Sequence, residues 1–439
     1  MDLITAQRRP SYKVKSKRHV SSRTLTCIDL FSGCGGLALG LEQAGFTPIL
    51  TSEVSLSALQ TYLANRINLD LQVHTDIYSL TEASLKANLF NWAASGIEDV
   101  DLVCGGPPCQ GFSGIGHRRT FTEVEKQDIP TNHLYQEMAR VIRTVQPRAF
   151  LFENVKGLLS ARWERGKGAK GEIFKAVLEE FSSIPNYEVR WELIHAKDYG
   201  VPQNRPRVLI VGIREDVIDG WRSPLLFDAP FEGPSAIKSG LLPGPVTTPP
   251  PSIPEVLSDL ANETFGYGSE DPTYKSSYTN EVQRQLRTRR SGSRLKKGDP
   301  LCEQYYSNHS QGIREKFAHM IKHDGEIPEK FQTKKFAQRV LPRSWGPTGP
   351  NITVASLAED YVHYSLPRSL TVREWARLQG FPDWYIFKGP RTTGGRRRAG
   401  DPSKGVWDRE VPKYTQIGNA VPVQLAHAIG KHLASLLGA

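Results

Sequence analysis

Over its first 215 residues the chain alternates short apolar runs with segments of helical periodicity, and this alternation restricts the fold most strongly. Uniformly apolar runs predict strands that are covered on both faces. We expect strands over residues 25–31, 47–53, 99–104, 149–155, 188–195 and 207–213, and helices over residues 37–44, 56–66 and 134–145. This order predicts an α/β fold with a doubly wound, mostly parallel, Rossmann-like sheet. Ligands of such sheets bind where the strands end, so candidate site residues are sought there.

The alternation stops near residue 216 and regular structure returns near residue 369. Residues 216–365 are rich in proline and glycine and then polar and irregular, which predicts a second, smaller, irregular domain. Two further helices are expected, over residues 371–379 and 423–437. The chain is therefore expected to comprise a basic N-terminal tail (1–23), a first domain (24–215), a second domain (216–365) and a C-terminal segment (366–439) that completes the first domain.

The charge of the chain favours a polyanionic partner. Lysine and arginine number 56 against 46 aspartate and glutamate, which gives a net charge of +10 and a pI near 9.3. This balance favours nucleic acid over an anionic membrane surface. No apolar run approaches the roughly 20 residues that a bilayer helix needs, so no membrane segment is expected.

The cysteine pattern argues against a disulfide framework. The five cysteines are an odd number and contain no C-x-x-C pair, so neither disulfides nor a metal site are expected. The N-terminus lacks the apolar segment of a secretory signal. A reducing, intracellular location is the simplest expectation.

A glycine-rich turn follows the first expected strand. The segment D-L-F-S-G-C-G-G-L (residues 29–37) joins that strand to a helix, where exposed N–H groups let a ligand approach the backbone closely. Glu53 ends the next strand, about 20 residues on, where a carboxylate can bind ribose hydroxyls. This pattern fits NAD, FAD or S-adenosylmethionine equally well, and the alternative is a tight turn needed only for helix–sheet packing.

A second loop, G-G-P-P-C-Q-G-F-S (residues 105–113), presents one cysteine at the end of a strand. Two glycines allow close backbone approach, and Pro107 and Pro108 stiffen the chain ahead of Cys109. A nucleophile needs such rigid presentation, and nearby cations would favour its thiolate. We favour a nucleophilic role for Cys109 over a structural one.

Two further strand ends carry charge. Glu153 closes the strand expected over residues 149–155, where an acid is costly to bury unless it is used or paired. Arg205 and Arg207 flank Pro206 at the start of another strand, and their guanidinium groups suit carbonyl or phosphate oxygens. Each also has an ordinary alternative: a helix cap or surface carboxylate for Glu153, and surface arginines for the other two.

Taken in order, these blocks resemble the cytosine-C5 DNA methyltransferase family. The resemblance covers roughly residues 25–215 and 366–431. It rests on the following segments: D-L-F-S-G-C-G-G, the strand end at Glu53, T-D-I with Asp76, G-G-P-P-C-Q-G-F-S, E-N-V, Q-N-R-P-R, R-S-L-T-V-R-E-W-A-R-L-Q-G-F-P and Q-I-G-N-A-V-P. So many blocks in family order leave little room for chance. In this family residues 216–365 correspond to the variable target-recognition region.

The resemblance implies covalent catalysis on cytosine. It assigns Cys109 as the thiolate that attacks C6, Glu153 to N3 and the exocyclic amine, and Arg207 to the O2 side, with Arg205 supporting the loop. The methyl donor is then S-adenosylmethionine. The implied cofactor-binding residues are Phe31, Gly33, Gly36, Leu37, Glu53, Asp76, Ile77, Pro107, Asn419 and Val421. Val54 departs from the family, in which an aromatic residue often follows the acidic residue.

The resemblance also implies partners and a setting. The substrate is double-stranded DNA, whose target base must be flipped out of the stack. A basic cluster in the second domain, formed by Arg284, Arg287, Arg289, Arg290, Arg294, Lys296 and Lys297, is expected to contact phosphates. Arg368, Thr371, Arg373 and Glu374 are expected to organise the recognition region against the catalytic domain, and the last helix to pack beside the glycine turn.

The expected setting is a bacterial restriction–modification system, with a monomeric, cytoplasmic, nucleoid-associated enzyme and a restriction endonuclease acting on the same site. Three other functions stay open. They are a tRNA cytosine-C5 methyltransferase, a catalytically silent DNA-binding relative, and an NAD-dependent dehydrogenase that only the glycine turn supports.

Overall fold

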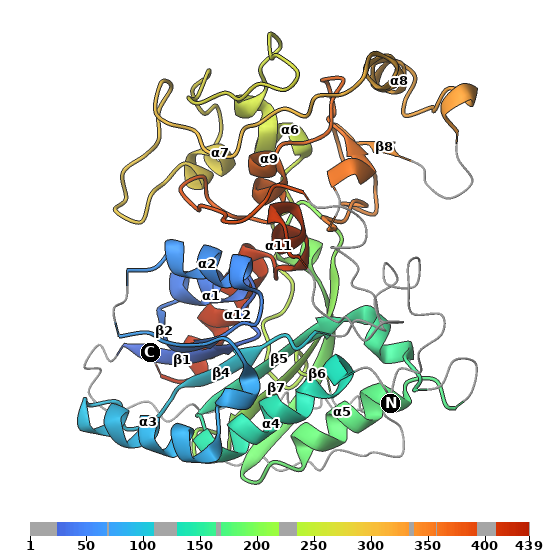
Figure 1. Ribbon diagram of the computed structural model, residues 1–439. Coiled ribbons are helices and arrows are strands. Elements are labelled where there is room, and N and C mark those ends of the chain that lie inside the picture. The colour runs from blue at the N-terminus through green and yellow to red at the C-terminus, as the bar shows by residue number, and fades with distance from the viewer. Residues whose placement is uncertain are drawn as a thin grey trace, which may run out of the picture.

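A seven-stranded sheet forms the base of the molecule (Figure 1). The computed structural model describes residues 24–67, 70–108, 130–163, 168–218, 235–332, 338–356, 358–392 and 410–438. The strand order is β3-β2-β1-β4-β5-β7-β6. The strands are β1 (Leu25–Leu30), β2 (Phe46–Ser52), β3 (Gln72–His74), β4 (Leu102–Gly105), β5 (Ala149–Val155), β6 (Tyr187–His195) and β7 (Pro206–Arg214). Only β7 runs antiparallel to its neighbours β5 and β6, so the predicted mostly parallel, doubly wound sheet is confirmed.

Helices cover both faces of this sheet. They are α1 (Gly36–Gln43), α2 (Leu56–Ala64), α3 (Glu82–Ala94), α4 (Leu134–Val145), α5 (Glu172–Ser182) and α12 (Val423–Leu436). Alternate residues of β1 point to opposite faces: Ile28 packs in the apolar cluster that includes α3, α4 and α5, whereas Cys27 packs in the cluster of α1 and α12. Both faces are therefore buried, which explains the uniformly apolar strands.

The two ends of the described chain meet on one face of the sheet. Gly40 of α1 lies so close to α12 that a Cβ there would stand 2.4 Å from the Cβ of Ala426 and 2.6 Å from the carbonyl oxygen of Val423. The prediction that the last helix packs beside the glycine turn is therefore confirmed.

A second, less regular unit lies above the carboxyl edge of the sheet (Figure 1). Its helices and strands are α6 (Ile253–Leu257), α7 (Glu281–Leu286), α8 (Gln311–Lys322), β8 (Arg339–Val340), β9 (Tyr361–Val362), α9 (Val372–Leu378) and α11 (Lys413–Asn419). Short 3-10 turns complete the two units: η1 (Ile77–Ser79), η4 (Pro130–His133), η5 (Lys156–Ser160), η6 (Ala196–Tyr199), η7 (Ser258–Leu260), η8 (Glu329–Phe331) and η9 (Ala358–Asp360). An apolar cluster joins α6 to α9, so residues distant in sequence share this core.

The start of the expected second domain packs elsewhere. Ala236, Leu241 and Leu242 are buried in the same apolar cluster as β7 and α12, and Gly240 accepts a hydrogen bond from Nε2 of His432 at 2.7 Å. The chain joins the core of the upper unit only at Ile253. We propose the division into tail, first domain, second domain and C-terminal segment as given above, although residues 236–242 of the second domain pack on the sheet unit.

No membrane-spanning element is found in the part of the chain that the structure describes, because none of its helices is both long and apolar enough.

Candidate active site

The register of the sheet brings four candidate positions into one row. Leu30 of β1 pairs with Ser52 of β2 and with Gly105 of β4, which in turn pairs with Phe152 of β5. The residues that follow these four positions are Phe31, Glu53, Gly106 and Glu153. They lie side by side at the carboxyl edge, where ligands of such sheets bind.

The glycine turn after β1 holds Glu53 through its backbone. The N–H of Gly33 donates to Oε2 of Glu53 at 2.9 Å, and the N–H of Ser55 donates to Oε1 at 2.7 Å. Burial raises the pKa of Glu53, whereas these two hydrogen bonds act to lower it. Phe31 and Gly33 both have a φ of 55°, a left-handed conformation that costs the non-glycine residue free energy. The turn therefore aims a fixed carboxylate at the sheet edge.

The C-terminal segment closes over the first turn of α1. A Cβ at Gly36 would stand 2.5 Å from the carbonyl oxygen of Val421, so only glycine fits there. The next residue, Leu37, is buried in the cluster that also holds Val421. Oγ of Ser356 donates to Oδ1 of Asn419 at 3.3 Å. The structure therefore brings Val421 against Gly36 and Leu37, from which it is distant in the sequence.

Asp76 and Ile77 lie beyond β3, beside Glu53. The N–H of Glu53 donates to the carbonyl oxygen of His74, the last residue of β3, at 3.0 Å. Asp76 caps η1 by accepting a hydrogen bond from the N–H of Tyr78 at 3.0 Å, and Ile77 is buried. Val54, whose side chain replaces the expected aromatic residue, is 80% exposed.

The loop that leads to Cys109 packs tightly against β5. A Cβ at Gly106 would stand 2.8 Å from Oε2 of Glu153, so the glycine gives the carboxylate room. The carbonyl oxygen of Pro107 accepts a hydrogen bond from Nδ2 of Asn154 at 3.1 Å. Cys109 itself lies outside the described residues, which end at Pro108 before this gap.

Glu153 and Arg207 form a buried ion pair beside this loop. Their side chains are only 12% and 8% exposed. Burial lowers the pKa of Arg207, while the neighbouring carboxylate of Glu153 raises it. A carboxylate and a guanidinium held side by side can contact adjacent donor and acceptor atoms of one planar ring.

Arg205 points away from this pair and into the protein. It is buried and donates to the carbonyl oxygens of Val354 at 2.7 Å and Gly418 at 2.5 Å. Burial and the neighbouring Arg207 lower its pKa. These contacts suit the expected supporting role, since they link the loop before β7 to the upper unit and the C-terminal segment.

Gln203 is a polar residue for which no role was predicted from the sequence. It is fully buried; its Oε1 accepts from the N–H of Val354 at 3.0 Å and its Nε2 donates to the carbonyl oxygen of Leu378 at 3.0 Å. Its position at the start of the Q-N-R-P-R block was the only feature of the sequence that could have indicated a structural role. It fixes the loop before β7 to α9.

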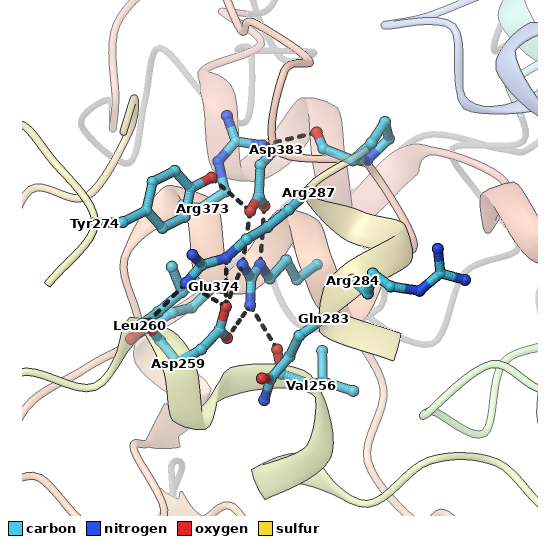
Figure 2. Close-up of polar contacts among 12 residues, drawn as sticks. Val256, Asp259, Leu260, Tyr274, Gln283, Arg284, Arg287, Arg373, Glu374 and Asp383 are labelled. Atoms are coloured by element: carbon cyan, nitrogen blue, oxygen red, sulfur yellow. Dashed lines mark hydrogen bonds and ion pairs between the residues drawn. The ribbon is translucent and has the colours of Figure 1, made fainter. Parts of the chain in front are cut away.

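Buried ion pairs hold the upper unit together (Figure 2). Arg377 of α9 binds Asp259 and Asp383, and the hydroxyl of Tyr274 donates to Oδ2 of Asp383 at 2.6 Å. Arg287 binds the same Asp259, with Nε at 2.7 Å from Oδ2, and none of its side chain is exposed. The prediction that Arg287 contacts phosphates is therefore wrong, because this guanidinium is enclosed by the protein.

The rest of the basic cluster is mixed. Arg290, Arg294, Lys296 and Lys297 are exposed, whereas Arg284 and Arg289 are half-buried. Arg284 also pairs with Glu281, and Arg290 donates to Oε2 of Glu42 in α1 at 3.0 Å. Arg294, Lys296 and Lys297 are thus the members best placed to meet a ligand.

Four residues from the R-S-L-T-V-R-E block hold the start of α9 in place within the upper unit. Arg368 makes a bidentate pair with Glu374, with hydrogen bonds of 2.7 and 2.6 Å. Thr371 donates to Oε1 of Gln304 at 2.8 Å, and Arg373 donates to the carbonyl oxygen of Cys302 at 3.2 Å. These contacts join the start of α9 to residues 302–304, and the role of the four residues in organising the recognition region against the catalytic domain stays a prediction.

The fold is an α/β, Rossmann-like sheet of the kind that methyltransferases share, with the candidate residues at its carboxyl edge. Residues 25–435 match the family model of the C-5 cytosine-specific DNA methylase. The chain belongs to this family and is a DNA (cytosine-5-)-methyltransferase.

Named relatives span nearly the whole chain. This chain is 32% identical to the type II methyltransferase M.DdeI of Desulfomicrobium norvegicum, and the match covers 93% of this chain and 88% of that protein. It is 30% identical to the type II methyltransferase M1.HphI of Haemophilus parahaemolyticus over 95% of this chain and 88% of that protein. A solved structure described as a prophage-encoded DNA modification methyltransferase (E. coli) has a TM-score of 0.64 at 23% identity, covering 94% of this chain and all of that one, and supports the fold.

Proposed function

We propose that this enzyme methylates C5 of a cytosine that is flipped out of a specific duplex DNA sequence, with Cys109 as the nucleophile and S-adenosylmethionine as the methyl donor. The observation that carries this proposal is the buried Glu153–Arg207 pair beside the loop that leads to Cys109. Cytosine C5 is a poor nucleophile, so the enzyme must first make the ring electron-rich.

The residues can supply each step of that chemistry. The Cys109 thiolate forms a bond to C6, while a proton held by Glu153 at N3 and the guanidinium of Arg207 at O2 take up the charge that the ring gains. C5 then has enamine character and would form a bond to the electrophilic methyl group that S-adenosylmethionine supplies, as the bond between that methyl group and the sulfonium sulfur breaks. Loss of the C5 proton and cleavage of the S–C6 bond release 5-methylcytosine.

Asn154 and Gly106 position this chemistry. Asn154 holds the carbonyl of Pro107 two residues before the thiol, and Gly106 lets the loop lie against Glu153. Glu153 is thereby kept between the loop and Arg207. Such preorganisation avoids the cost of reorientation during the reaction.

The cofactor residues fit a nucleoside that carries a charged amino-acid portion. Glu53 is fixed by two backbone donors and retains free lone pairs for ribose hydroxyls. Asp76 lies near it, and the exposed side chains of Val54 and Tyr78, at 80% and 57%, give apolar surface that an adenine ring can cover. The turn through Phe31, Gly33 and Gly36 leads backbone N–H groups to the same edge.

We place duplex DNA between the sheet unit and the upper unit, because the upper unit lies above the carboxyl edge of the sheet, where the candidate residues follow the strands (Figure 1). By analogy with the type II relatives, the enzyme protects host DNA in a bacterial restriction–modification system, with a restriction endonuclease that reads the same site. We further propose that it acts as a cytoplasmic, nucleoid-associated monomer.

The covalent step is tested with a duplex that carries 5-fluorocytosine at the target. Fluorine cannot leave C5 as a proton does, so the active enzyme is expected to become trapped on the DNA. Cys109→Ala should abolish trapping and turnover while cofactor binding is retained. Cys302→Ala is the matched control, because Cys302 is an exposed free cysteine in the segment between α7 and α8 of the upper unit. Normal turnover by Cys109→Ala would reject the assigned nucleophile.

The substrate is tested by bisulfite sequencing of plasmid and of tRNA from a methylation-free host that expresses the chain. We expect converted cytosines everywhere except at one short plasmid sequence. Protection of tRNA and not of plasmid would instead support the tRNA methyltransferase, and no protection of either would support the silent relative.

A further inference from the structure

The C-terminal end of α8 brings three unused ligand groups together. His319 and His323 lie four residues apart, so both imidazoles occupy one face of the helix. Their rings are stacked with centroids 4.2 Å apart. Glu326 joins them, and one donor atom of each of the three residues lies within 4.8 Å of the other two.

A tight reversal of the chain brings Glu326 back to the helix. Asp324 and Gly325 both have left-handed φ values, of 48° and 91°. The N–H of Gly325 donates to the carbonyl oxygen of Met320 at 2.7 Å, and that of Glu326 donates to the carbonyl oxygen of His323 at 2.9 Å. The backbone of the turn is thus already fixed in the conformation that places the carboxylate beside the two rings.

The packing of α8 supports this turn from below. Phe317 and Met320 are buried against Val362 of β9, and Ile327, which follows Glu326, packs in the same cluster. The three polar groups therefore project from an anchored element rather than from a free loop.

The roles described above for the catalytic and cofactor residues do not involve these three side chains. Nε2 of His319 is buried and has no hydrogen-bond partner among the described residues. An unpaired buried ring nitrogen costs free energy, which a ligand at this position would recover. The carbonyl end of a helix also favours positive charge, so a cation is electrostatically suited to this location.

We propose that His319, His323 and Glu326 bind one Zn²⁺ ion, with water as a fourth ligand. Two imidazoles and one carboxylate form a known donor set for zinc with an open position. Donor atoms around tetrahedral zinc stand about 3.3 Å apart, so His323 and Glu326, which are exposed, need only side-chain rotation to close on the ion. The expectation that no metal is bound rested on the cysteines alone, whereas this group consists of two histidines and a glutamate.

The ion would fix the end of α8 in the upper unit. In Figure 1 α8 lies at the outer margin of that unit, away from the carboxyl edge of the sheet. Bound zinc would therefore lower local opening of residues 311–327 and leave the chemistry of methyl transfer unchanged.

The test is zinc binding by the full-length, tag-free protein after EDTA treatment and removal of the chelator. In competition with a chromophoric chelator we expect one Zn²⁺ per chain. Substituted Co²⁺ should give the visible absorption of a tetrahedral site. Hydrogen exchange should slow in peptides from residues 311–327 when zinc is added.

Variants separate this site from other ligands. The double variant His323→Asn, Glu326→Gln should bind zinc at least tenfold more weakly, while Glu329→Gln, an exposed carboxylate outside the group, and Cys109→Ala should bind as the unaltered protein does. Unchanged binding by the double variant, loss of binding in Cys109→Ala, or no stoichiometric binding at all would each overturn the proposal.

Because both altered side chains are exposed, the double variant should keep its unfolding temperature without zinc and its methyl transfer. A failure of methyl transfer in the unaltered protein would contradict only the proposed function.

Discussion

Glu153 is the residue on which the chemistry of the site depends most directly. Strand β5 buries its carboxylate, Gly106 leaves it room, and Arg207 pairs with it. A charged group so enclosed needs its partner, since an unpaired buried charge costs several kcal/mol.

At the residue scale, we predict that Glu153→Gln lowers kcat for methyl transfer at least 100-fold. The amide cannot hold and release the proton at N3, and it leaves Arg207 without its counterion. The measurement is transfer of labelled methyl groups to a duplex that contains the target. Glu179→Gln, on the surface of α5, should retain normal turnover. Unimpaired turnover by Glu153→Gln would remove this residue from the mechanism.

The arginines show how little charge alone reveals at this scale. Arg287 and Arg294 belong to one basic stretch of sequence, yet Arg287 is buried against Asp259 and Arg294 is exposed. Asp259 lies 28 residues from Arg287, and no local pattern links the two. Only the packing of α6 and α7 against α9 decides which guanidinium is enclosed.

At the element scale, the contact between α1 and α12 depends on small residues, of which Gly40 is approached most closely. A side chain at Gly40 would meet backbone atoms of α12, which cannot move aside as a flexible side chain could. The two helices therefore approach more closely there than helices with larger side chains can.

We predict that Gly40→Ala destabilises the protein by about 1–3 kcal/mol, because the methyl group forces α1 and α12 apart. Urea unfolding gives the measurement. Gly244→Ala is the control, since a Cβ at Gly244 would meet no atom within 4 Å. Equal stability of the two variants would mean that the helices separate without cost.

Helix α9 carries a pH-dependent contribution to stability through Glu374. Burial raises its pKa, but the charge and hydrogen bonds of Arg368 outweigh burial and lower the pKa from 4.5 to about 2. A folded-state pKa below the unfolded one favours folding at higher pH. The contribution is therefore complete above about pH 5 and is lost as the pH falls toward 2.

For this pair we predict that the free energy of unfolding falls by about 3 kcal/mol between pH 5 and pH 2 through Glu374 alone. Glu374→Gln should remove this part of the pH dependence and, at pH 7, destabilise the protein because Arg368 stays buried without a counterion. Denaturant unfolding at several pH values measures both effects. Glu315→Gln, which alters an exposed carboxylate, should follow the unaltered protein; an unchanged pH profile in Glu374→Gln would contradict the argument.

At the scale of the whole molecule, two units made from interleaved segments enclose the candidate site. The C-terminal segment contributes α9 to the upper unit and α12 to the sheet unit, and Arg205 and Gln203 connect the two. The units are thus tied together through the loop before β7.

We predict that the exposed cations Arg294, Lys296 and Lys297 contribute to DNA binding. Replacing all three with glutamine should reduce the slope of log K against log salt by about 1–3, since each phosphate contact contributes roughly 0.9. Fluorescence anisotropy of a labelled duplex over a range of salt concentrations gives the slope. A control that replaces Lys86, Lys175 and Lys238 on the sheet unit removes the same charge and should leave the slope unchanged. Equal slopes for both triple variants would place the DNA elsewhere.

The sequence by itself determined the core of the sheet and which glycines and charged residues follow its strands. Uniformly apolar strands, glycines at strand ends and charged residues after them are local signals, because they follow from backbone conformation and burial on both faces. On this basis the ranges expected for α4 and β5 agree with the structure. Strand β3 and helices α3 and α5 were not predicted; β3 has only three residues, too few to show a pattern.

Only the tertiary structure decided how the distant segments meet. It paired Glu153 with Arg207, buried Arg287, gave Gln203 its contacts and gathered His319, His323 and Glu326. These outcomes depend on packing between segments, and a polar side chain carries no local mark of the partner that will bury it. Local sequence therefore predicts which groups are present, whereas the enclosure that sets their charge and accessibility arises only when the segments pack.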